Sequence, residues 1–269
     1  MRLATLMVLL LVATMAGANG VEVDFETSDG VLVYGDLYLA PDRQKDAPLI
    51  LLFHQGGGDA RGEYGPLVDH LLAEGYHALA IDQRRGGDRF GMFNRTSERF
   101  DAQRRSYEDV SYCDAYADLQ AALQFADSYG FTGPRVAWGS SYSAALAIRL
   151  AAENADDIDA VLAFSPASGD AMAGCQPEQY SDRVTQPMLA LRPISEMQAP
   201  SVPVQLELFR EQGHQTHVAD PGVHGSSMLN ESRVGAPTDE TWKVVLDFIR
   251  ASLGEHHTTT ESLQKELSQ

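Results

Sequence analysis

A serine set among small residues is the strongest candidate for chemistry in this chain. The stretch Trp138-Gly-Ser-Ser-Tyr-Ser-Ala-Ala145 follows a short apolar run and precedes a run of small and apolar residues. This context predicts a sharp turn from a strand to a helix, which would expose Ser141 as a nucleophile. Gly139 fills the small position before the serine, and Ser143 replaces the glycine that is usual after it. With a base beside it, such a serine hydroxyl can attack a carbonyl carbon.

A histidine after the last predicted strand is the candidate base. His224 lies in the sequence Pro221-Gly-Val-His-Gly-Ser-Ser-Met228 and comes after Ser141 in the order that strand-turn-helix serine nucleophiles require. His214 and His217 are rival candidates. We favour His224 because His214 precedes the predicted strand at 216–219 and His217 lies within it.

The acid that would orient this histidine is predicted between the other two residues in chain order. Glu196 is the one carboxylate close behind the predicted strand at 188–191, in the sequence Arg192-Pro-Ile-Ser-Glu-Met197. Asp220 is the runner-up, since it is near His224 in sequence but follows a different strand. Glu196 would hold His224 in position and stabilise its cationic form, unless it is simply a solvated surface carboxylate.

The elements that must position these residues alternate between strands and helices after an opening antiparallel hairpin at 21–25 and 31–39. This order predicts an α/β fold with a doubly wound, mostly parallel sheet and helices on both faces. Residues 83–112, rich in arginine, show no period and are predicted to form a long loop. The other expected strands are 48–53, 76–81, 135–138, 161–164, 188–191 and 216–219, and the expected helices are 64–72, 116–125, 143–152, 202–212 and 242–253.

A second motif, Phe53-His-Gln-Gly-Gly-Gly58, follows the third predicted strand. Together with the serine turn it resembles the α/β-hydrolase superfamily, and more narrowly its dienelactone-hydrolase-like branch, over most of residues 21–254. The resemblance implies an oxyanion hole formed by the backbone N–H groups of Gly56 and Tyr142. Ser143, Gln55 and Glu196 depart from the superfamily's usual glycine, glycine and aspartate.

The ends of the chain differ from its middle. Arg2, an apolar run over 3–15 and small residues up to Gly20 have the order of a secretory signal peptide, although a retained anchor is the alternative. We therefore expect a signal peptide at 1–20, one domain at 21–254, a polar and mobile tail at 255–269, and a secreted or periplasmic protein. In an exported chain, Cys113 and Cys175 would form a disulfide, or else remain two buried thiols.

The expected function is hydrolysis of a small carboxylic ester or lactone, because the short segment between the strands at 161 and 188 leaves room for only a small cap. A peptidase or amidase of the same fold, or a non-catalytic binding protein, are the alternatives. No cofactor or metal is expected, and His54 is predicted to hold its loop. The net charge of −18 argues against a nucleic-acid partner.

Two short patterns need a structural test. The arginines of 83–112 are expected to pair with acids of their own segment, although they could bind a carboxylate substrate; these acids are Asp88, Glu98, Asp101, Glu108 and Asp109. Asn94-Arg-Thr96 and Asn230-Glu-Ser232 match the acceptor pattern for N-glycosylation.

Overall fold

The computed structural model describes residues 20–102 and 110–254. The expected signal peptide, apart from Gly20, and the expected tail at 255–269 lie outside this range. Within it, no helix combines the length and the apolar character needed to cross a membrane.

One eight-stranded sheet, in the order β1-β2-β4-β3-β5-β6-β7-β8, forms the centre of the molecule. The first hairpin pairs antiparallel, β2 is also antiparallel to β4, and every later pairing is parallel. The strands are β1 (Val21–Glu26), β2 (Leu32–Tyr38), β3 (Leu49–Phe53), β4 (His77–Asp82), β5 (Arg135–Ser140), β6 (Ala160–Phe164), β7 (Met188–Pro193) and β8 (Gln215–Ala219). The predicted mostly parallel sheet with an antiparallel start is confirmed.

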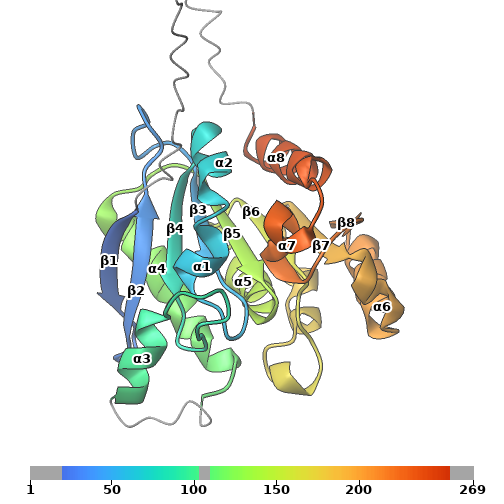
Figure 1. The fold of residues 1–269 in the computed structure, drawn as a ribbon, viewed down its shortest axis with the longest axis horizontal. Coiled ribbons are helices and arrows are strands. Elements are labelled where there is room, and N and C mark those ends of the chain that lie inside the picture. The colour runs from blue at the N-terminus through green and yellow to red at the C-terminus, as the bar shows by residue number, and fades with distance from the viewer. Residues whose placement is uncertain (1–19, 103–109, 255–269) are drawn as a thin grey trace, which may run out of the picture.

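Helices cover both faces of the sheet, as predicted, because alternate strand residues point to opposite sides. On one face, Leu49 and Leu51 pack in the same apolar cluster as residues of α4 (Tyr116–Tyr129), α5 (Tyr142–Glu153) and α6 (Ser201–Glu211). On the other, Ile50 and Leu52 cluster with residues of α1 (Ala60–Tyr64), α2 (Val68–Ala73) and α8 (Asp239–Leu253). Figure 1 shows α1 and α2 in front of the sheet and α4 behind it.

Two of the expected helical boundaries were wrong. The single helix expected at 64–72 is two short helices, α1 and α2, separated at Gly65-Pro66, where proline lacks a backbone N–H and breaks helical pairing. The loop expected at 83–112 contains α3 (Arg95–Ala102). Asn94 caps this helix, since its Oδ1 accepts from the Ser97 N–H at 2.8 Å. The polar composition of α3 gave no apolar period to detect.

The expected ion pairs within 83–112 were also wrong for two of its arginines. Arg84 bonds the buried Asp118 at 2.8 Å, and Arg95 bonds Asp36 and Asp82 at 2.7 and 2.6 Å. All three acids belong to the framework around the sheet. The ion pairs of Arg84 and Arg95 therefore hold residues 83–102 against the sheet and α4.

The two asparagines of the glycosylation patterns are buried. Asn94 is 1% exposed and Asn230 is 8% exposed. The Asn94 amide donates to the Gln83 carbonyl at 2.9 Å and contacts His54 Nε2 at 3.0 Å. In the folded chain neither asparagine is accessible for modification.

The structure joins Cys113 and Cys175 by a disulfide with an S–S distance of 2.04 Å. Cys113 begins the short 3₁₀ turn η2 (Cys113–Ala115) that directly precedes α4, and Cys175 lies in the segment between β6 and β7. The sequence separation is 62 residues. The bond thus closes a long loop, which is where a cross-link most restricts the unfolded chain.

Replacing both cysteines by serine is expected to lower the free energy of unfolding by about 4 kcal/mol, by the chain-entropy relation for a loop of this length. Urea unfolding of the two proteins, followed by circular dichroism, measures this difference. A loss below about 1 kcal/mol would show that the bond adds little to the constraint already present in the unfolded chain.

Candidate active site

The residues singled out by sequence come together at one end of the sheet. Gly56 follows β3, Ser141 follows β5, Glu196 follows β7 and His224 follows β8. These four strands are parallel, so their carboxyl ends lie at the same edge. Open α/β sheets bind their ligands outside this edge.

Ser141 occupies a strained turn between β5 and α5. Its φ and ψ angles are 62° and −119°, outside the regions that a serine usually adopts. Its N–H donates to the Phe164 carbonyl at 2.8 Å, and its carbonyl accepts from the Ala144 and Ala167 N–H groups at 3.1 and 3.0 Å. The surrounding backbone therefore holds Ser141 in the conformation expected of a nucleophile in this kind of turn.

Small residues stand two positions before and after Ser141, and each is there for a different structural reason. A Cβ on Gly139 would lie only 2.3 Å from the Ser143 carbonyl oxygen, so no other residue fits where the helix crosses the strand. Ser143 fits in place of the usual glycine, because its hydroxyl donates to the His54 carbonyl and accepts from Gln83 Nε2 at 3.1 Å. This departure from the motif links the turn to the loop after β3.

His224 and Glu196 form a short contact, with 2.5 Å between Nδ1 and Oε1. The His224 side chain is 47% exposed and the Glu196 side chain 19% exposed. Burial alone would raise the pKa of Glu196, but hydrogen bonds from His224 and Arg192 outweigh it and lower that pKa below its usual value. Glu196 is therefore ionised at neutral pH, and it can orient His224 and stabilise its cation.

Two further side chains hold Glu196. Arg192 Nη1 bonds Oε2 at 2.7 Å, while Nη2 of the same guanidinium donates to Gln205 Oε1 and the Pro166 carbonyl. The Ser165 hydroxyl donates to Oε1 at 3.1 Å and accepts from the Gly225 N–H at 3.1 Å. Ser165 thus connects the segment that carries Glu196 to the residue after His224.

The rival residues lie elsewhere. Asp220 is exposed, and within the described part of the chain it forms no hydrogen bond or ion pair with a histidine. His214 contacts the Ser181 carbonyl at 2.9 Å through Nε2. His217 is within β8, where burial lowers its pKa. Glu196 and His224 are therefore the acid and histidine that the structure brings together.

The loop after β3 is arranged around His54. His54 Nε2 accepts from the Gln83 N–H at 2.9 Å, so Nδ1 carries the proton and donates to the Gln55 carbonyl at 2.9 Å. Burial lowers the pKa of His54, which keeps the ring neutral. The described residues also contain no cluster of histidine, cysteine and acidic side chains that could hold a metal ion.

The Gly56 N–H, an expected oxyanion donor, bonds no acceptor in the described parts of the chain. A Cβ at this position would approach the Tyr112 hydroxyl to 3.0 Å. The Tyr112 ring in turn packs on the ring of Tyr142, the other expected donor residue, with 4.6 Å between centroids. Tyr112 therefore bridges the two segments that carry the expected oxyanion hole.

Sequence reasoning missed several residues of this region. Arg192 stood four residues before Glu196, a spacing that could have suggested their ion pair in a helical turn. Ser165 has a φ of 50° and carried no motif. Glu63, which contacts Gln55, lies just before the helix expected at 64–72 and carried no motif. Only tertiary packing brings the last two to the site.

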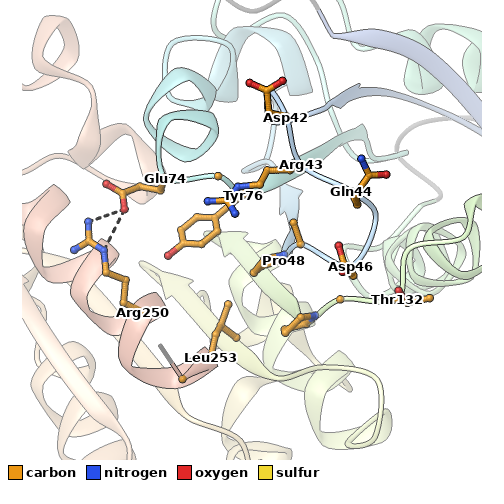
Figure 2. A pocket seen from close by; sticks show the side chains of 15 residues that line it. Asp42, Arg43, Gln44, Asp46, Pro48, Glu74, Tyr76, Thr132, Arg250 and Leu253 are labelled. Atoms are coloured by element: carbon orange, nitrogen blue, oxygen red, sulfur yellow. Dashed lines mark hydrogen bonds and ion pairs between the residues drawn. The ribbon is translucent and has the colours of Figure 1, made fainter. Parts of the chain in front are cut away.

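A hollow lies at the opposite end of the sheet. Its volume is about 640 Å³, and its lining includes Pro48, Tyr76 and Pro134, which precede or flank the amino ends of β3, β4 and β5. Figure 2 shows Arg250 bonded to Glu74 at its rim, with distances of 2.7 and 3.1 Å to one carboxylate oxygen. This hollow is remote from the carboxyl ends of the strands and is separate from the candidate active site.

Solved structures share this fold. An acylaminoacyl peptidase from Pyrococcus horikoshii superposes with a TM-score of 0.65 at 12% identity, over 93% of this chain and 44% of its own. An esterase from Pyrococcus furiosus gives 0.62 at 18% identity, over 88% and 92%. Est1E from Butyrivibrio proteoclasticus, with bound ferulic acid, gives 0.63 at 15% identity, over 84% and 99%. At such identities the likeness shows the fold alone, and this chain spans under half of the peptidase.

A family model gives a more specific result. No curated protein matches the sequence. The model of the serine aminopeptidases, S33, matches residues 44–228, which is more than half of the chain and includes Ser141, Glu196 and His224. The matched model is not that of the dienelactone hydrolases, so the narrower resemblance stays a prediction. The chain belongs to the S33 serine aminopeptidase family, whose members are serine hydrolases of the α/β-hydrolase superfamily.

Proposed function

We propose that this serine hydrolase cleaves a carboxylic ester or lactone through a covalent ester on Ser141. The observation that carries the proposal is the short contact between His224 and the ionised Glu196, with the loop of His224 packed against the turn of Ser141. The packing is direct, since the Ser226 N–H donates to Ser140 Oγ at 3.0 Å. A nucleophile, a base and an orienting acid are the parts that acyl transfer needs.

In the first half of the reaction, His224 Nε2 takes the hydroxyl proton as Ser141 Oγ attacks the carbonyl carbon. The carbonyl oxygen becomes an oxyanion, which the N–H groups of Gly56 and Tyr142 would stabilise. When the tetrahedral intermediate collapses, its carbon–oxygen bond to the alcohol breaks and His224 returns the proton to that alcohol. The acyl group then remains on Ser141.

In the second half, water replaces the alcohol. His224 takes a proton from the water molecule as the water oxygen attacks the acyl carbon. The second tetrahedral intermediate then expels Ser141 Oγ. Ser141 regains its proton from His224, and a carboxylic acid leaves. Throughout, Glu196 remains a carboxylate and accepts from His224 Nδ1.

The bond that is hydrolysed could be an ester or an amide, because an esterase and a peptidase both have similar folds. The preference for esters rests on the segment between β6 and β7, where the structure has only short 3₁₀ turns at Asp170–Met172, Pro177–Gln179 and Ser181–Arg183. So small a cap suits a small ester or lactone. The family's name and the similar acylaminoacyl peptidase favour amide hydrolysis instead.

A panel of p-nitrophenyl esters, lactones and aminoacyl p-nitroanilides measures this preference. We expect a higher kcat/KM for small esters or lactones than for any aminoacyl amide. Activity that fell when Ser141 was replaced would show that the turnover belongs to this site. Faster turnover of the amides would overturn the proposed substrate class and favour a peptidase.

We also propose that the protein works outside the reducing cytoplasm, as a secreted or periplasmic enzyme. The signal-like order of residues 1–20 and the Cys113–Cys175 disulfide support this location. Fractionation of cells that express the full chain tests it. Full-length protein recovered only from the cytoplasm, with reduced thiols, would contradict it.

A further inference from the structure

A buried carboxylate lies beneath the candidate active site, and the proposed reaction leaves it without a role. Glu63, in α1, is fully buried. Its carboxylate accepts from the Gln55 N–H at 2.8 Å through Oε2 and lies 3.4 Å from the Gln55 side-chain amide through Oε1. Gln55 immediately precedes Gly56, so this bond fixes the loop that carries an expected oxyanion donor.

Glu63 also contacts the turn of the nucleophile. Burial raises the pKa of its carboxyl, while hydrogen bonding with the Ser140 hydroxyl and the Gln55 N–H opposes this rise. Ser140 is fully buried and immediately precedes Ser141. The Ser140 hydroxyl oxygen accepts from the Ser226 N–H at 3.0 Å, which joins the turn of the nucleophile to the loop of His224.

The third segment of this network carries His224. A Cβ on Gly225 would lie 2.3 Å from Ser140 Oγ and 3.3 Å from the Gln55 amide nitrogen, so the histidine loop packs tightly on both partners of Glu63. Ser226 Oγ accepts from Trp138 Nε1 at 2.8 Å. The histidine loop is thereby anchored to β5 as well.

Arg233 supplies the positive charge near this buried acid. Its guanidinium bonds the Gly62 carbonyl and, at 3.2 Å, Ser227 Oγ, and its charge lowers the pKa of Glu63. It therefore connects α1 to the same histidine loop. A buried carboxylate is costly unless it is hydrogen bonded and compensated, and here these interactions offset only part of the rise in the Glu63 pKa that burial causes.

We propose that Glu63 is a positioning residue that fixes the loop of Gly56, the turn of Ser141 and the loop of His224 relative to one another. This inference rests on the proposed hydrolase function. Glu63 contacts no reacting atom in that reaction; it acts through Gln55 and Ser140. Removing its carboxylate leaves the Gln55 N–H and the Ser140 hydroxyl without their shared acceptor, so the three segments can shift.

The test compares Glu63→Ala and Glu63→Gln with the unchanged protein on one ester substrate, with kcat expressed per active site that a fluorophosphonate probe labels. Glu63→Ala is expected to lower kcat by about 100-fold, the cost of a displacement near 1 Å, with little change in KM. Glu63→Gln keeps an acceptor for the Gln55 N–H and should retain activity within about 10-fold, as one lost hydrogen bond implies.

Asp59→Ala is the matched control, because Asp59 is a fully buried carboxylate that belongs to the same short helix. It caps α1 by accepting from the Gly62 N–H at 2.6 Å, and within the described residues it forms no hydrogen bond with Gln55 or Ser140. We expect the free energy of unfolding of this variant to fall by about 1 kcal/mol, the usual cost of removing a helix N-cap, and its kcat to stay unchanged. An equal loss of kcat in both alanine variants would overturn the proposal.

A double-mutant cycle covers the case in which Glu63→Ala does not fold. Glu63→Gln and Ser140→Ala interrupt one network, so their effects on kcat should be less than multiplicative when combined. Multiplicative effects, or unchanged kcat with a lowered melting temperature, would leave Glu63 a merely structural residue and overturn the inference. Failure of the proposed function is seen separately, as absence of Ser141-dependent labelling in the unchanged protein.

Discussion

Replacing Ser141 by alanine is expected to lower kcat by roughly 10⁵- to 10⁶-fold, the loss seen when a serine nucleophile is removed. The alanine has no oxygen to form the acyl ester, so only binding and the oxyanion donors remain to assist water. The backbone strain at φ 62° belongs to the turn and is expected to persist in the variant. Steady-state kinetics on a p-nitrophenyl ester, with circular dichroism to confirm folding, measures the effect.

Ser128→Ala is the control for this substitution, because Ser128 lies exposed on α4. It should leave kcat and KM unchanged. If Ser141→Ala retained more than about a tenth of the activity, a different nucleophile or a non-covalent reaction would have to replace the proposed one.

Replacing Glu196 by glutamine is expected to lower kcat by about 10⁴-fold, as the loss of an orienting carboxylate does in serine hydrolases. The amide has no charge to stabilise the His224 cation, and it can present an N–H to Nδ1, which favours the wrong tautomer. KM should change little, because Glu196 touches His224, Arg192 and Ser165. Kinetics on the same ester measures kcat and KM separately.

Asp220→Asn is the matched control, since Asp220 was the competing carboxylate in the sequence. We expect this variant to keep its activity. A large loss in Asp220→Asn with little loss in Glu196→Gln would move the role of the acid to Asp220.

The sign of the pKa shift adds a further expectation to the Glu196 experiment. The pKa of Glu196 is lowered in the folded protein, so its carboxylate stays ionised while the pH falls through the usual glutamate value of 4.5. The stabilisation from the Glu196 interactions is therefore present above 4.5 and is lost only as pH falls through the lowered value. Protonation of Glu196 should accordingly not limit the rate at any pH above this usual value.

Much of the fold could be predicted from the sequence, because its buried parallel strands are continuous apolar runs. The runs at 48–53 and 161–164 correspond to β3 and β6. The polar helix α3 could not be found in the same way, since Asn94 caps a segment that buries little apolar surface. Pro66 was a visible signal for the break between α1 and α2, and the helical spacing across it was misleading.

Some residues of the candidate site could be found from local sequence motifs, and others only from the tertiary structure. Ser141 and His224 stood in local motifs whose residue types reflect a turn and a loop, and the structure puts both at the carboxyl edge of the sheet. Glu196 followed from chain order alone, and its contact with His224 required the fold. Ser165 and Glu63 act through contacts between segments far apart in the chain, which no local pattern encodes. The four-residue spacing of Arg192 and Glu196 was a local signal for their ion pair.

The most direct test of the central claim is reaction of the folded protein with a fluorophosphonate probe, followed by mass spectrometry of its peptides. We expect one covalent adduct on Ser141, formed by the unchanged protein and absent from Ser141→Ala. No adduct on the folded protein, or equal labelling of the Ser141→Ala variant, would contradict the claim that Ser141 is the activated nucleophile.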